Sequence, residues 1–210
     1  MIYKIEPIKD DLIQSAYEEG MKVFGDFWGI NWVINKPNIL MFGSRKEIDD
    51  YKGTKTEPWV VGWANNGIIH LLGFDKLGIE SAKKYTVEKY SSLVKHELGH
   101  LFYKSKSGGK DTPRWLNEGL SIYLSGQIKT QGKPEKLVNF LDFYSEGGAR
   151  VYDESGFVIE LLINMYGKEK IIELVKLLGT IKNEDDLKEK FMDVYGFELS
   201  YKKMNELYLK

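Results

Sequence analysis

The sequence predicts an α+β fold, in which a small mixed or antiparallel sheet with helices forms the first half and helices form the second half. Two patterns carry this prediction. Short apolar runs between turn residues occupy the first third of the chain, and apolar residues at helical spacing follow from about residue 82. With 210 residues and 42% hydrophobic content, the chain can bury the core of one domain made of two lobes.

The first lobe is expected to begin with one helix and three strands. Residues 12–24 have a helical pattern, while residues 38–42, 59–63 and 68–72 are short apolar runs typical of strands. The pair Asn66-Gly67 separates the last two runs, and such a pair favours the left-handed backbone of a tight hairpin. The sequence therefore predicts that these two runs pair as antiparallel strands.

A long helix over residues 82–103 follows, with one narrow apolar stripe that should pack inward. The stripe recurs at three- and four-residue steps and consists of Val87, Tyr90, Val94, Leu98 and Leu101. Residues 105–112 are rich in Ser and Gly and should form a loop after this helix. This loop is the predicted boundary between an α/β lobe at residues 1–104 and a helical lobe at residues 105–210.

The second lobe is expected to start with Thr112 as the N-cap of a helix and Pro113 at its first position. Helical patterns cover residues 116–124, 135–144, 157–166, 171–178, 187–195 and 201–209. Gly167, Gly179 and Gly196 follow three of these patterns, at positions where a C-terminal cap needs a positive φ angle.

Within the long helix, His96, Glu97 and His100 form the pattern His-Glu-x-x-His. Residues four apart on a helix differ by about 40° in direction and about 6 Å in height, so two imidazoles can bind one ion. Glu97 lies to the side of this pair, where it can reach a water molecule at the metal without binding the metal itself. The pattern is short and also occurs by chance, but here it contains two of just three histidines.

A catalytic zinc takes three protein ligands and leaves a fourth position to water. Glu118 lies eighteen positions beyond His100, in a run that begins a new helix after the loop. A helix, a reversing loop and a second helix can bring this carboxylate back to the histidines. Without the histidine pattern, Glu118 would be interpreted as an exposed glutamate near a helix N-terminus, where the helix dipole favours negative charge. Together with the histidine pattern, Glu118 is the predicted third ligand of one zinc ion per chain.

The run HELGH followed by PRWLNEGLSIY resembles the gluzincin clan of zinc peptidases, in particular the aminopeptidase N-like group and smaller peptidases with the same catalytic core. The resemblance covers about residues 85–167. It implies a zincin-like fold and hydrolysis of peptide bonds. It also implies that His96, His100 and Glu118 are the zinc ligands, with Glu97 as the general base.

The resemblance further implies that Tyr152, just before a predicted helix, stabilises the oxyanion of the transition state and takes no part in metal binding. A tyrosine at such a place is also commonly a packing residue. Tyr103 and Tyr144 are the next candidates for the oxyanion donor.

Two features depart from the aminopeptidases of this group. Their Gly-x-Met-Glu-Asn signature has a glutamate that binds the free amino end of the substrate, whereas residues 62–67 here read GWANNG, with no acidic residue. The interval from His100 to Glu118 is also one residue shorter than usual, which a loop can absorb. We therefore expect an endopeptidase in preference to an aminopeptidase.

The strand at residues 68–72 is a candidate for the edge strand along which such enzymes align an extended peptide. His70 lies in this strand and alternates with Ile68 and Leu72, which predicts a half-buried histidine of the sheet and not a site residue. The five tryptophans are expected in the core.

Composition limits the other functions. With 30 Lys and Arg against 31 Asp and Glu, the chain has no excess of positive charge for nucleic acid or an anionic membrane. Without cysteine, a metal must be bound by His and carboxylates. No stretch approaches the roughly 18 apolar residues of a membrane span. A peptide or protein substrate is the expected partner, and the expected location is cytoplasmic, with a removed signal peptide as the alternative.

Two further functions are compatible with the same residues. One is a zincin-like domain that binds or regulates without hydrolysis, which an intact Glu97 disfavours. The other is a zinc hydrolase of a non-peptide amide or ester, which the sequence does not separate from a peptidase.

Overall fold

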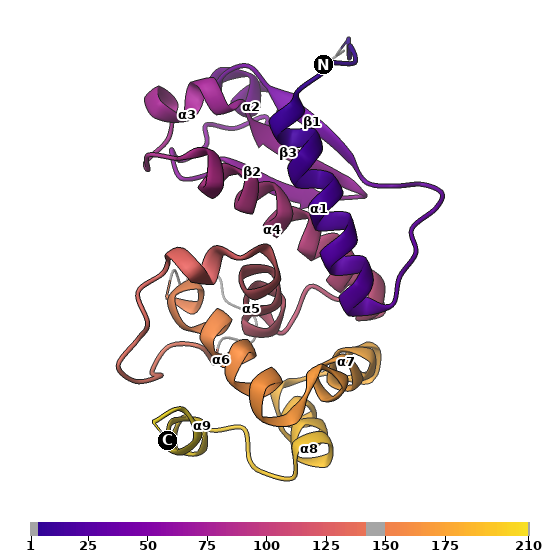
Figure 1. Cartoon of the computed structure of the whole chain (residues 1–210), viewed down its shortest axis with the longest axis vertical. Coiled ribbons are helices and arrows are strands. Elements are labelled where there is room, and N and C mark those ends of the chain that lie inside the picture. The colour runs from indigo at the N-terminus through magenta and orange to yellow at the C-terminus, as the bar shows by residue number, and fades with distance from the viewer. Residues whose placement is uncertain (1–3, 142–149, 210) are drawn as a thin grey trace.

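The computed structural model describes residues 4–141 and 150–209, which form a mixed α+β fold with a small sheet and many helices (Figure 1). The upper part of Figure 1 contains the sheet with α1 (Asp11–Trp28), α2 (Arg45–Lys52), α3 (Phe74–Glu80) and α4 (Val87–Lys106). The lower part contains α5 (Arg114–Ser125), α6 (Val151–Tyr166), α7 (Lys168–Leu177), α8 (Glu184–Tyr195) and α9 (Tyr201–Tyr208), with 3-10 turns at Gln127–Thr130 and Leu178–Thr180. Helices α4 and α5 pack together where the two parts meet.

The sheet has three strands among the described residues, in the order β1 (Asn38–Phe42), β3 (Ile68–Leu72), β2 (Gly62–Asn65). Strand β3 is parallel to β1 and antiparallel to β2. The hairpin between β2 and β3 turns at Asn66 and Gly67, with φ angles of 50° and 76°, as the Asn-Gly pair predicts.

The expectation that residues 68–72 form an edge strand is wrong. Strand β3 lies between the other two strands, so its backbone groups are already paired and no peptide can be added to it. The edge strand that packs against α4 is β2. This strand starts at Gly62 and not at residue 59, because the guanidinium of Arg45 binds the carbonyl groups of Glu57, Pro58 and Val60 and holds that segment outside the sheet.

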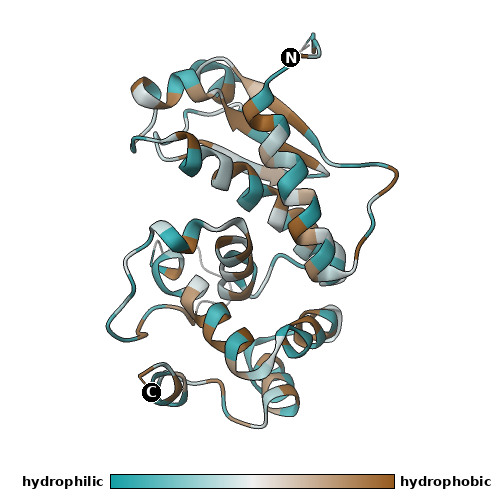
Figure 2. Ribbon diagram, in the orientation of Figure 1, coloured by the Kyte–Doolittle hydropathy of each residue, from teal (hydrophilic) through white to brown (hydrophobic). Residues whose placement is uncertain are grey.

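The apolar stripe of the long helix is confirmed in its central part. Tyr90, Val94 and Leu98 are fully buried and Leu101 is nearly so, whereas Val87 in the first turn is half exposed. The helix starts at Val87, five residues later than expected, because Thr86 caps it by accepting a hydrogen bond from the amide of Lys89. Figure 2 shows that hydrophilic and hydrophobic residues alternate along the helices.

Several details of the second lobe differ from the prediction. Residues 135–141 are not helical, and the rest of the expected helix at 135–144 lies outside the described residues. Pro113, not Thr112, is the residue that precedes α5. Gly167 and Gly196 end α6 and α8 with positive φ angles, but Gly179 lies inside the 3-10 turn at Leu178–Thr180. The short helices α2 and α3 were not expected from the sequence.

Two glycines allow α5 to approach its neighbours closely. A Cβ atom on Gly99 of α4 would lie 2.8 Å from Ser121 Oγ of α5, and one on Gly119 of α5 would lie 2.7 Å from the carbonyl oxygen of Ser155 in α6. Only residues without a side chain permit these approaches. The glycines next to the predicted metal ligands therefore set how near α4, α5 and α6 come to one another.

Candidate metal centre

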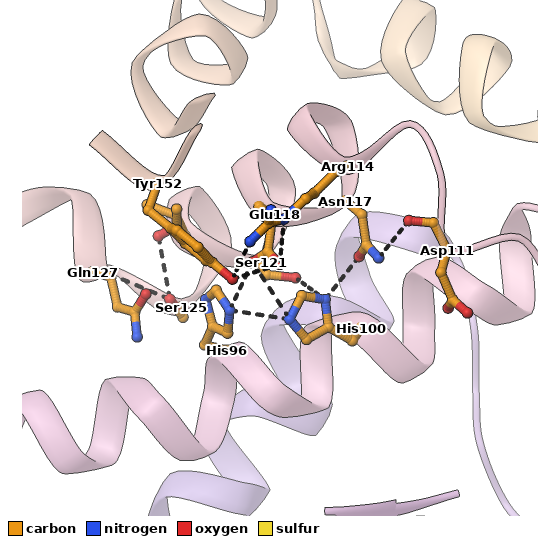
Figure 3. Close-up of polar contacts among 11 residues, drawn as sticks. His96, His100, Asp111, Arg114, Asn117, Glu118, Ser121, Ser125, Gln127 and Tyr152 are labelled. Carbon is orange, nitrogen blue, oxygen red and sulfur yellow. Dashed lines mark hydrogen bonds and ion pairs between the residues drawn. The ribbon is translucent and has the colours of Figure 1, made fainter. Parts of the chain in front are cut away.

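Three side chains from two helices bring their donor atoms together. His96 and His100 come from α4, one turn apart, and Glu118 comes from α5 (Figure 3). The Nε2 atoms of the histidines are 3.1 Å apart, and Glu118 Oε2 lies 3.2 Å from the first and 3.6 Å from the second. Within residues 4–141 and 150–209, no other group of three His or acidic residues converges in this way.

This triangle of donor atoms fits a tetrahedral metal ion. Nitrogen and oxygen ligands lie about 2.0 to 2.1 Å from zinc, so two ligand atoms of a tetrahedron are about 3.3 to 3.4 Å apart. The separations of 3.1, 3.2 and 3.6 Å are close to that value. Glu118 Oε2 is buried and makes no well-formed hydrogen bond to any described residue, although both rings lie near it. A buried carboxylate oxygen of this kind is suited to bind a cation.

His100 is oriented by a hydrogen bond on the far side of its ring. Asn117 Nδ2 donates to the carbonyl oxygen of Asp111 over 3.1 Å, which turns the amide oxygen of Asn117 toward the ring. That oxygen can only accept, so its 2.8 Å contact with His100 Nδ1 requires a proton on Nδ1. The lone pair of Nε2 then faces the donor triangle, which is the tautomer that metal binding needs.

His96 has no such anchor. Its Nδ1 atom is buried without a hydrogen-bond partner among the described residues, and its ring stands at 87° to that of His100. The polar contacts of the ring are on its Nε2 side, toward His100 and Glu118, and 6% of the residue is exposed. Of the two histidines, His100 is therefore the better preorganised.

The carboxylate of Glu118 uses its two oxygens differently. Oε2 faces the histidines, while Oε1 accepts a hydrogen bond from the hydroxyl of Tyr152 over 3.1 Å and lies 3.9 Å from Arg114 Nε. Burial raises the pKa of Glu118, but His100, His96 and Tyr152 outweigh burial and lower the pKa to about 2. The carboxylate is therefore ionised at neutral pH.

Glu97 of α4 lies near strand β2 and has no polar partner among the described residues. The residue is 6% exposed, and its carboxylate makes no hydrogen bond or ion pair with the described part of the chain. A Cβ atom on Gly62 would lie 3.3 Å from Glu97 Oε1, so the side chain points toward β2. Burial raises the pKa of Glu97 to about 7, with an opposing effect of His100 and a smaller reinforcing effect of Glu118.

Tyr152 lies beside the donor triangle, but not before a helix. It is the second residue of α6, which starts at Val151 and not at residue 157. Its hydroxyl also accepts a hydrogen bond from Arg114 over 3.1 Å. Of the other two tyrosines considered, Tyr103 is buried and donates to the carbonyl of Thr112, while Tyr144 lies outside the described residues.

Sequence reasoning overlooked Asn117 and Arg114. Asn117 directly precedes the third ligand, and Arg114 lies four residues before that ligand, on the same face of α5. The rule that metal-binding side chains are held by further hydrogen bonds would have been the signal for polar residues at these two positions.

His70 is a histidine of the sheet, as expected, and is more deeply buried than expected, at 3% exposure. Its Nε2 contacts the hydroxyl of Tyr51 at 3.1 Å, and its ring stacks on Trp63 with 4.5 Å between centroids. Among the described residues, His70 belongs to no group of three His or acidic residues with converging donor atoms.

Comparisons with known proteins give one weak relative. No family model and no solved structure matches the chain. The chain is 27% identical over 165 residues to the uncharacterized protein YhcO of Bacillus subtilis (strain 168), an alignment that covers 70% of this chain and 50% of that protein. The chain thus spans about half the length of this curated relative.

Within residues 4–141 and 150–209, no helix is long and apolar enough to cross a membrane.

Proposed function

We propose that the chain is a zinc-dependent metallopeptidase of the gluzincin type with a zincin-like fold. The observation that carries this proposal is the convergence of His96 Nε2, His100 Nε2 and Glu118 Oε2 next to Glu97, a buried carboxylate that no described residue pairs. A site that only stores or senses a metal has no need of such a carboxylate.

The chemistry of the donors favours zinc. Two imidazoles and one carboxylate are a common ligand set of catalytic zinc, in which one position stays open. Magnesium and calcium prefer oxygen ligands alone, and sites for copper(I) are rich in sulfur. One zinc ion per chain is therefore the proposed cofactor.

A bound zinc ion supplies Lewis acidity toward a carbonyl group and makes water a better acid. Glu97 accepts the proton of the water molecule whose oxygen forms the new bond to the carbonyl carbon. As the C–N bond breaks, Glu97 returns the proton to the leaving nitrogen. Burial raises the pKa of Glu97, which makes its carboxylate a stronger base toward the water molecule.

The edge strand β2 supports an extended peptide as the substrate. Its outer backbone groups are not used by the sheet, and Gly62 in this strand lies against Glu97. A peptide added along this edge by backbone hydrogen bonds passes next to the general base. Residues 62–67 have no acidic side chain for a free amino end, which favours an endopeptidase.

Two measurements on the purified chain test the proposal. Elemental analysis after incubation with zinc and desalting should find close to one equivalent. A peptide library, followed by one cleaved sequence with a free and with a blocked amino end, should show cleavage that does not need the free end. Zinc binding without cleavage of any peptide would favour a binding domain or a hydrolase of non-peptide bonds, and absence of zinc would overturn the proposal.

A further inference from the structure

We propose that Arg114 and Tyr152 are positioning residues for the metal, which hold Glu118 by its Oε1 atom so that only Oε2 is presented to the ion. This inference rests on the proposed function, because it concerns the same site. It gives Tyr152 a role in metal binding, which the family resemblance does not imply. It also gives a role to Arg114, for which the sequence predicts none.

The direction of each hydrogen bond follows from the chemistry of the groups. Arg114 can only donate, so the 3.1 Å contact of its guanidinium with the Tyr152 hydroxyl uses a lone pair of the hydroxyl oxygen. The single proton of that hydroxyl is then available to Glu118 Oε1, 3.1 Å away. The three groups form a chain in which arginine donates to tyrosine and tyrosine donates to glutamate (Figure 3).

This chain decides which oxygen of Glu118 meets a metal. Oε1 is occupied by Tyr152 and lies 3.9 Å from the positive charge of Arg114, whereas Oε2 is buried and has no well-formed hydrogen bond. Rotation of the carboxylate that would bring both oxygens to the ion would break the bond to Tyr152. A carboxylate held in this way would bind a metal ion through one oxygen and would leave a position open for water.

Local sequence and packing maintain the arrangement. Arg114 lies four residues before Glu118, one turn away on α5, and its guanidinium stands 5.1 Å from the centroid of the Tyr152 ring. Tyr152 comes from the first turn of α6. Gly119 of α5 allows the close approach of α6, because a Cβ atom at this position would lie only 2.7 Å from the carbonyl oxygen of Ser155. Both partners of Glu118 are thus fixed by elements that pack closely.

The test is the affinity of the full chain for Zn²⁺, measured by competition with a chromophoric chelator. Tyr152→Phe and Arg114→Gln should each weaken binding by about 10- to 100-fold, the usual effect of removing a partner of a metal ligand. The double variant should lose less than the product of the two single losses, because Arg114 acts largely through Tyr152. Arg114→Lys, which keeps a charged donor, should retain more affinity than Arg114→Gln.

A spectroscopic readout separates positioning from general damage to the fold. In the Co²⁺-loaded protein, visible absorption is intense for four ligands and weak for five or six. Tyr152→Phe should lower this intensity, because a released carboxylate can bind through both oxygens. The matched control is Tyr166→Phe, at the other end of α6 and far from the donor triangle, which should change neither the affinity nor the spectrum.

The outcomes distinguish the two proposals. If the parent chain binds no Zn²⁺, the proposed function fails. If the parent binds and both Tyr152→Phe and Arg114→Gln bind within two-fold of it, the positioning role is overturned. An equal loss in Tyr166→Phe would also overturn it, because the effect would then be unrelated to Glu118. A loss in Tyr152→Phe without one in Arg114→Gln would remove Arg114 from the inference.

Discussion

The chain buries histidines in two regions, and the two regions use them in opposite ways. In the sheet, His70 has its Nε2 atom against the Tyr51 hydroxyl and its ring flat on Trp63. In the helix pair α4 and α5, the Nε2 atoms of His96 and His100 face each other and a carboxylate oxygen. The first arrangement uses the ring within the protein, and the second leaves its lone pairs for a cation.

The difference teaches that burial alone does not identify a metal ligand. All three histidines are at least partly buried, and His70 is the most deeply buried of them. What separates the regions is convergence, because three donor atoms lie within 4.8 Å of one another at one and not at the other. The orientation of His100 by Asn117 adds to the contrast, since the contact of the sheet histidine at Nε2 is with the hydroxyl of Tyr51.

The largest expected effect is on zinc content, which should be lost when a histidine of the helix pair is replaced and kept when the histidine of the sheet is replaced. His100→Gln should reduce bound zinc from about one equivalent to near zero after desalting, because two ligands remain. The same substitution in the sheet, His70→Gln, should leave the zinc content unchanged. Elemental analysis of both variants makes the comparison. Equal losses of zinc in the two variants would contradict the assignment of His100, and not His70, as a metal ligand.

A second prediction separates the ligands from their neighbour Glu97. Glu97→Gln keeps the shape of the side chain but cannot accept a proton, so peptide hydrolysis should fall by about 100- to 10,000-fold. The zinc content should stay near that of the parent, because Glu97 does not belong to the donor triangle. The rate of peptide cleavage and the zinc content are measured on the same sample. Full activity would exclude Glu97 as the general base, and loss of zinc would indicate that it binds the metal.

The third prediction concerns the orientation of His100. Asn117→Ala removes the acceptor that selects its tautomer and should weaken zinc binding by about 10- to 100-fold. Competition with a chelator measures this loss. Asn164→Ala, at an exposed position of α6, is the matched control and should bind as the parent does. An affinity for Asn117→Ala within two-fold of the parent would show that Ser121, 3.3 Å from Nδ1, is a sufficient anchor.

The smallest expected effect is on the pH dependence of stability and involves the sheet. Burial and the charge of Lys52 lower the pKa of His70 below its ordinary value of 6.5. Below pH 6.5 the unfolded chain therefore binds more protons at this residue than the folded chain does. The free energy of unfolding should fall with decreasing pH, by at most about 1.4 kcal/mol per pH unit from this group.

Urea unfolding of the metal-free chain between pH 8 and pH 5 measures this slope. In His70→Gln, which does not titrate, the fall below pH 6.5 should be less steep than in the parent. Identical slopes would mean that His70 keeps an ordinary pKa in the folded chain.

The sequence by itself determined the three candidate ligands and much of the secondary structure. His96 and His100 are one turn apart in any helix, and the helical stripe around Val94 and Leu98 makes a helix there the stable state. The strand at Asn38–Phe42 and the Asn-Gly hairpin follow equally from local patterns, because short apolar runs and left-handed turns depend on nearby residues.

Only the tertiary structure decided which strand is at the edge and which side chains orient the ligands. Strand order depends on pairing between distant segments, so the apolar run of β3 looked the same whether central or at an edge. The contact of Tyr152 with Glu118 spans 34 positions and needs α5 and α6 to approach at Gly119. Local periodicity carries no information about such approaches, because they depend on how side chains of separate helices fill the space between them.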